Sequence, residues 1–111
     1  MTTSFEDREK GFEAKFAHDQ EFRFLALARR DKLFARWAAA RLGLDEARTE
    51  AFVHDVLAVP DGPGHDPALL RLVAERLAEH GARMPEGELT AELGRCAETA
   101  REQLIAAPPA H

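Results

Sequence analysis

Apolar residues recur every three or four positions along most of the chain, and this spacing is typical of amphipathic helices. Strong helix formers dominate the sequence, whereas Tyr is absent and β-branched residues are few. The pattern therefore predicts an all-α protein. The helices of its body are expected at about His18–Leu42, about Asp45–Val59, from Asp66 up to Gly81, and about Glu86–Ala107.

Residues that begin and end helices support these boundaries. Gly43 suits a helix C-terminus, and Asp45 suits the N-cap of the helix that follows. The segment 60–65 is rich in proline and glycine and is the clearest break in the chain. Asp66 followed by Pro67 predicts a capped helix start. Because the connections are short, neighbouring helices are expected to run antiparallel in a four-helix bundle.

The apolar positions are distributed differently in the first and the last of these helices. In the first helix they cover much of the circumference, which predicts a central helix packed on several sides. In the last helix they form one stripe that consists of Leu89, Leu93, Cys96, Ala97, Ala100 and Leu104. Cys96 is therefore interpreted as a small core residue rather than as a nucleophile.

Residues 4–17 form a separate amphipathic arm in front of the body. Ser4 to Asp7 fits the pattern of a helix start, and Phe5, Phe12 and Phe16 would lie within about 40° of one another on a helix. Two interpretations stay open. The aromatic stripe either docks on the body and extends the first helix, or it stays loose in the free protein and inserts into a groove on a partner.

Composition narrows the class of protein. The chain has 111 residues, enough for one domain, and a net charge of -5, which argues against a general nucleic-acid binder. A single cysteine excludes a disulfide framework and suits a reducing compartment. We expect neither a signal peptide nor a membrane span, and hence a small cytosolic domain.

No motif for nucleotide chemistry is present, since the sequence has neither a P-loop nor a Gly-x-Gly-x-x-Gly string. His-Asp pairs occur three times, at His18-Asp19, His54-Asp55 and His65-Asp66. All-α metal phosphohydrolases use such a dyad, so this activity is kept as a minor alternative. Simpler roles are available, such as Asp66 as a helix cap and Asp55 on a polar face.

The first 44 residues contain strings whose spacing is specific. They are Phe5-x-Asp7-Arg8-Glu9, Phe12-Glu13-x-Lys15-Phe16-Ala17-His18-Asp19, Ala28-Arg29-Arg30, Trp37-Ala38-Ala39 and Leu42-Gly43. In these strings the chain closely resembles the zeta subunit of the α-proteobacterial F-type ATP synthase, a family of natural inhibitors of that enzyme's ATPase activity. The resemblance fades after Gly43, although the helix layout remains compatible to the C-terminus.

The resemblance implies an inhibitory segment at 1–19 and a helical bundle at 20–111, in a single domain overall. The segment would insert as a helix into a catalytic interface between the α and β subunits, near the γ shaft, and block rotation in the hydrolysis direction. Such a protein is not an enzyme. It is expected to be monomeric when free and cytoplasmic, and to attach peripherally to the membrane-bound ATP synthase without entering the membrane or binding nucleic acid.

The resemblance also implies which residues meet the α, β and γ subunits. Three phenylalanines would be apolar anchors, and the basic side chains between them would meet acidic groups on the enzyme. The implied partner-binding residues are Phe5, Arg8, Glu9, Lys10, Phe12, Lys15, Phe16, His18 and Asp19. The chain departs from the family at Asp31, where Asn is usual, and at Phe16, where Tyr is common.

A second alternative is a nucleotide-sensing regulatory bundle whose occupancy controls release of the arm. Weak ATP or ADP binding to the bundle is discussed for the family, although inhibition itself requires no cofactor. No residue of this sequence locates such a nucleotide site.

Overall fold

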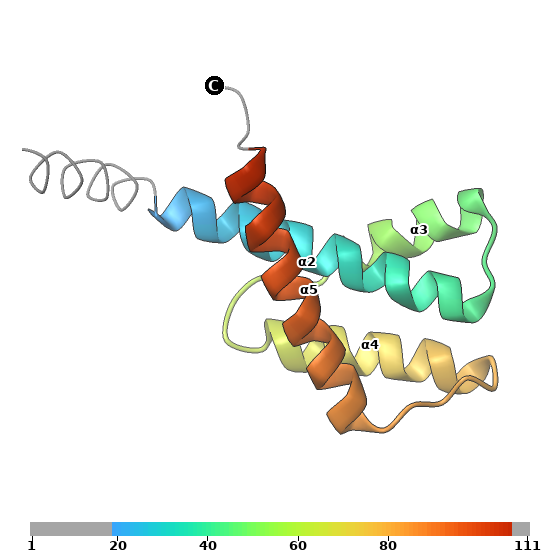
Figure 1. Ribbon diagram of the computed structural model, residues 1–111. Helices are drawn as coiled ribbons and strands as arrows, with labels where there is room; N and C mark the ends of the chain where they lie inside the picture. Colours follow the sequence, from blue (N-terminus) through green and yellow to red (C-terminus); the bar gives the residue numbers. More distant parts are fainter. Residues whose placement is uncertain (1–18, 108–111) are drawn as a thin grey trace, which may run out of the picture.

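A computed structural model describes residues 19–107 of the chain (Figure 1). This part is built from α2 (Asp19–Leu42), α3 (Glu46–Leu57), α4 (His65–Glu79) and α5 (Glu86–Ala106). It contains no strand, so the predicted all-α fold and the four helices of its body are confirmed. None of these described helices is long and apolar enough to cross a membrane.

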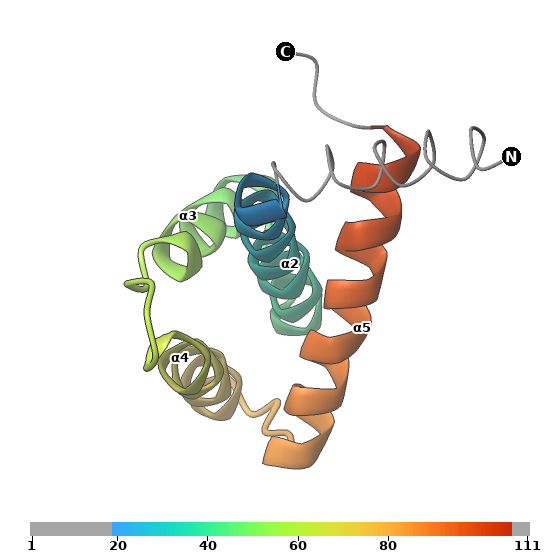
Figure 2. The ribbon, with the colours of Figure 1, turned by 90° about the vertical axis from the view of Figure 1, so that its left-hand side faces the viewer.

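The first three helices run back and forth, and α5 crosses them. Figure 1 shows α3 returning antiparallel to α2, and α4 returning antiparallel to α3. In Figure 2, where α5 lies in the plane of the view, the other three helices are seen nearly end-on. The antiparallel expectation therefore holds for the first two connections and is wrong for the third. Here the chain turns at Gly81, whose φ of 72° is left-handed, and α5 lays its apolar stripe across α2.

The buried core is shared by all four helices. From α2 it takes Phe34 and three alanines, and small side chains at these positions let the neighbouring helices approach closely. The other core residues are Phe52, Val53, Val56, Leu69, Val73, Leu77, Leu89, Leu93 and Cys96. The predicted stripe of the last helix is buried at five of its six positions, since Ala100 and Leu104 are buried as well, and Ala97 is partly exposed. The second half of α2 is thus the centre of the bundle.

The first half of α2 is less enclosed than its sequence pattern predicts. Phe24 is 62% exposed and Leu27 is 49% exposed, although both belong to the apolar set that predicted a helix packed on several sides. The difference follows from length, since α2 has 24 residues whereas α3 has 12 and α4 has 15. The beginning of α2 therefore extends past α3 and α4, as Figure 1 shows.

Most predicted helix boundaries agree with the structure to within two residues. Asp45 is the N-cap of α3, and its carboxylate accepts a hydrogen bond from the backbone N–H of Arg48 at 2.8 Å. Gly43 has a φ of 68° and ends α2, where the backbone N–H of Leu44 donates to the carbonyl of Ala39. α3 ends at Leu57, two residues before the predicted Val59.

The predicted start of α4 is wrong in its detail. The helix begins at His65 and its N-cap is Gly64, which has no side chain to cap it. Asp66 therefore lies inside the first turn and is not the cap. Its carboxylate instead accepts two hydrogen bonds from the guanidinium of Arg30, and a charged bidentate pair of this kind is stronger than a single cap bond.

Candidate functional site

The partner-binding residues expected from the sequence lie almost entirely outside the described part of the chain. Asp19 is the first residue of α2, and the other eight (Phe5, Arg8, Glu9, Lys10, Phe12, Lys15, Phe16 and His18) precede it. The division into 1–19 and 20–111 therefore stays a prediction. What the structure adds is a polar network at the middle of α2 and a groove along the beginning of this helix.

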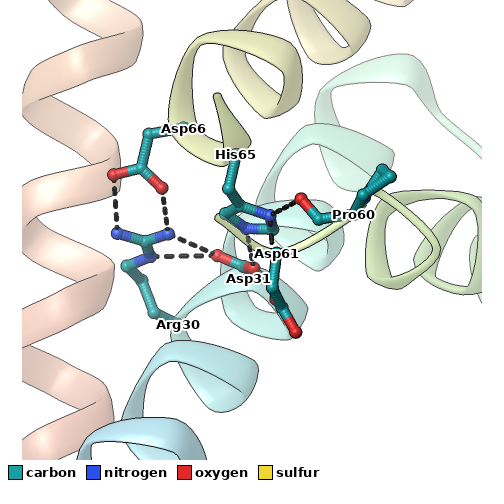
Figure 3. A network of polar contacts seen from close by, with 6 residues as sticks. All are labelled: Arg30, Asp31, Pro60, Asp61, His65 and Asp66. Atoms are coloured by element: carbon teal, nitrogen blue, oxygen red, sulfur yellow. Dashed lines mark hydrogen bonds and ion pairs between the residues drawn. The ribbon is translucent and has the colours of Figure 1, made fainter. Parts of the chain in front are cut away.

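The polar network joins α2 to the start of α4 (Figure 3). Arg30 donates from Nη2 to Oδ1 of Asp66 at 2.7 Å and from Nη1 to Oδ2 at 3.2 Å. Its Nε donates to Oδ1 of Asp31 at 2.9 Å. The Arg30 and Asp31 side chains are only 8% and 6% exposed. One guanidinium therefore holds two carboxylates from two different helices, and little of it reaches water.

His65 completes the network from the other side. Its Nε2 lies 2.7 Å from Oδ2 of Asp31, and its Nδ1 lies 3.0 Å from the backbone carbonyl of Pro60. The Asp61 carboxylate is further away, at 3.9 Å from Nδ1, and is itself mostly exposed. Figure 3 shows the imidazole between Asp31 and the carbonyl of Pro60. His65 thereby fixes the segment 60–65 against α2.

Proton affinities in the network follow from these contacts. Burial disfavours the charge on Arg30, but its hydrogen bonds and ion pairs with Asp66 and Asp31 outweigh that cost and raise the pKa of Arg30. The hydrogen bonds that Arg30 donates hold the pKa of Asp66 below its ordinary value. The network is therefore built from charged groups that stabilise one another.

A groove of about 760 Å³ lies beside the network, along the first turns of α2. Its apolar lining includes Phe24, Leu27 and Leu57, and the side chain of Leu57 is 46% exposed. Asp31 and His65 of the network line its polar side. The groove thus places exposed apolar side chains next to the residues that hold α4 against α2.

The described residues supply no set of ligands for the metal phosphohydrolase alternative. Between 19 and 107, no group of three or more His, Cys, Asp or Glu side chains is placed to hold a metal ion. The ring of His65 already faces Asp31 and Pro60 with its two nitrogens, and Asp66 is taken up by Arg30. The His54-Asp55 pair is exposed, and its aspartate meets Arg76 at 3.3 Å.

Cys96 lies in the core, as its place on the apolar stripe predicted. Burial, together with the nearby carboxylate of Glu92, raises the pKa of the Cys96 thiol to about 11. The thiol is therefore protonated at neutral pH and unsuited to nucleophilic attack.

The network was not predicted from the sequence, although all of its residues can be read there. Arg30 was noted only within a family-like string, Asp31 only as a departure from the family, and His65 only at the end of the segment 60–65 and in a His-Asp pair. The signal that could have found it is position. Arg30 and Asp31 stand four residues before Phe34 and Ala35, on the face that this helix buries, and an acidic residue stands at a later helix start. The pairing itself required the spatial arrangement of α2 and α4.

The described part is thus an all-α protein whose buried polar groups pair with one another between helices. Compared with known protein families, residues 1–103 match the family of the ATPase inhibitor subunit zeta. The match covers nearly the whole chain, including the arm, and this chain belongs to that family. A comparison with curated proteins and one with solved structures found no match.

Proposed function

We propose that this chain inhibits ATP hydrolysis by the F-type ATP synthase and is itself not an enzyme. The observation that carries the proposal is the family match over residues 1–103, because it includes both the arm and the bundle. In the proposed mechanism the arm inserts as a helix at a catalytic interface between the α and β subunits, near γ, and blocks rotation. Insertion of this kind needs no cofactor, although weak ATP or ADP binding to the bundle is compatible with it.

The described residues support this proposal in two ways. α2 is an uninterrupted helix from Asp19, so the arm joins directly onto a rigid element. The exposed side chain of Leu27 would then extend the apolar stripe of the arm, whereas Phe24, also exposed, falls about 80° away from Phe16 on a continuous helix. Leu27 falls 11 residues after Phe16, which places it on the same side of a continuous helix. Exposed apolar side chains of this kind mark protein-binding surfaces.

The proposal assigns different roles to residues of the arm. Phe5, Phe12 and Phe16 are the apolar anchors, and burying one phenylalanine contributes about 1.5–3 kcal/mol. The basic residues Arg8, Lys10 and Lys15 meet acidic groups on the enzyme, with Glu9, His18 and Asp19 completing the contact. The complex would lie in the cytoplasm, at the periphery of the membrane that carries the ATP synthase.

Deleting residues 1–19 is expected to abolish inhibition and to leave a folded bundle. The reason is that every side chain of the described core lies between residues 34 and 104. The test is ATP hydrolysis by the purified catalytic head of the cognate ATP synthase, titrated with the full chain and with the chain 20–111. Circular dichroism of the shortened chain reports whether it is folded.

The outcomes of this titration separate two parts of the proposal. Inhibition by the full chain alone supports both the partner and the role of the arm. Equal inhibition by both chains would refute insertion of the arm, and inhibition by neither would refute the inhibitory function itself.

Replacing Phe12 or Phe16 with Ala is expected to weaken inhibition about 10-fold to 100-fold, the equivalent of one buried phenylalanine. The melting temperature should stay nearly unchanged if the arm does not dock on the body. The control is Ile105→Ala, which removes an exposed apolar side chain (67%) at the far end of the chain and should leave inhibition intact. A fall in melting temperature with the Phe variants would favour the docked arm instead.

A further inference from the structure

Both ring nitrogens of His65 face atoms that can only accept hydrogen bonds. Nε2 faces a carboxylate oxygen of Asp31 at 2.7 Å, and Nδ1 faces the carbonyl oxygen of Pro60 at 3.0 Å. Each contact is a hydrogen bond only when the nitrogen carries a hydrogen. A neutral imidazole has one N–H, whereas the imidazolium ion has two. The geometry is therefore fully satisfied by the protonated ring alone.

The charges around the ring agree with this conclusion. The charged side chains near the ring are Asp31 and Arg30 of α2, Asp61 of the segment before α4, and Asp66 of α4. Arg30, Asp31 and Asp66 together carry one negative charge, which a protonated His65 balances. Burial of the ring opposes the charge, but the hydrogen bond to Pro60 and the carboxylates of Asp31 and Asp66 outweigh it, so the pKa of His65 is raised.

We propose that His65 is a proton-operated latch, which ties the segment 60–65 and the first turn of α4 to α2 while the ring is protonated and releases one of its two ties when the proton leaves. The loss is local. A neutral ring can donate either to Asp31 or to Pro60 but not to both, so one of these two acceptors loses its donor. Arg30 still holds Asp31 and Asp66 after that loss, so the helices stay together.

The place of the latch gives it a consequence at the surface. Asp31, His65 and Asp66 line the same groove as Phe24 and Leu27. A change in how the segment 60–65 is held therefore changes the wall of that groove opposite the beginning of α2. This inference concerns the chain on its own and does not depend on the proposed inhibitory function.

The sign of the pH dependence is fixed by the direction of the pKa shift. Because the folded state raises the pKa of His65, the stabilisation is fully present below the ordinary histidine value of 6.5. It is lost as the pH rises through the folded-state value. Stability that depends on this latch is thus greater in weakly acidic than in alkaline solution.

The direct test is a titration of the full chain followed by NMR, from about pH 5.5 to about pH 8.5, where carboxylates stay charged. The ring of His65 is expected to titrate above 6.5, and the backbone amides of residues 61–66 and 30–31 should shift with the same midpoint. A His65 ring that titrates at or below 6.5, or amides there that do not follow it, would overturn the proposal.

Two variants show which contacts operate the latch. Asp31→Asn keeps an acceptor of the same shape but removes its charge, so the His65 midpoint should move down relative to the unmodified chain. In the unmodified chain the urea midpoint should fall between about pH 5.5 and about pH 8.5. In His65→Gln this fall should vanish. His54→Gln, which changes an exposed histidine, should retain that fall. An unmoved His65 midpoint in Asp31→Asn, or an undiminished pH dependence in His65→Gln, would contradict the latch.

Discussion

Replacing Arg30 with Met is expected to lower the free energy of unfolding by about 3 kcal/mol, near the lower end of the range for removing one member of a buried ion pair. Met keeps most of the aliphatic stem, so the loss reports the guanidinium rather than packing. Without that group, the Asp31 carboxylate stays 94% buried, and within the described part of the chain it is left with the ring of His65 as its ion-pair partner. The value is not higher because the Asp66 side chain is 52% exposed and can be solvated.

Arg36→Met is the matched control for this change. Arg36 also belongs to α2 and also forms a short ion pair, with Glu50 of α3 at 2.6 Å. Both side chains are exposed, at 44% and 57%, so water screens the pair and its loss should cost about 0–1 kcal/mol. Urea unfolding of the two variants at neutral pH measures the difference. Equal losses would show that burial adds nothing to the Arg30 network.

Replacing Leu93 with Ala is expected to destabilise the protein by about 2–5 kcal/mol, the usual cost of a cavity left by a core leucine. Leu93 lies in the middle of α5, is 6% exposed and belongs to the cluster that joins all four helices. The change removes apolar contacts without introducing a polar group. Thermal or urea unfolding followed by circular dichroism measures the loss.

Ile105→Ala serves as the control within the same helix. Ile105 is 67% exposed, so its truncation removes little buried area and should change stability by no more than about 0.5 kcal/mol. If Leu93→Ala were as mild as this control, the packing of α5 across α2 would be wrong.

Helix positions could be predicted from the sequence because their signals are local. Apolar spacing, Gly43 at the end of α2 and Asp45 before α3 each act through residues within one or two turns. The direction of α5 could not be predicted in this way. It depends on how the apolar stripe of α5 fits across α2, which is a contact between residues far apart in the chain.

At the candidate site, too, local features could be predicted from the sequence and contacts between distant residues could not. The stripe of Phe5, Phe12 and Phe16 was found from spacing alone, and it stays a prediction because it precedes the described residues. Asp66 was assigned a local role as a helix cap, and the structure gives it a distant partner in Arg30. Local propensity favours the cap, but the bidentate ion pair in a partly buried position is worth more.

The early start of α2 changes what binding by the preceding residues would require. Starting a helix in a free chain is costly, because several residues must be fixed before the first hydrogen bond forms, whereas lengthening an existing helix costs little per residue. The buried second half of α2 keeps this helix in place, so the helix that begins at Asp19 already supplies a nucleus for helix growth. A segment that becomes helical on a partner would lengthen the helix from Asp19. It would avoid the free-energy cost of starting a helix, which a detached peptide of the same sequence would have to overcome.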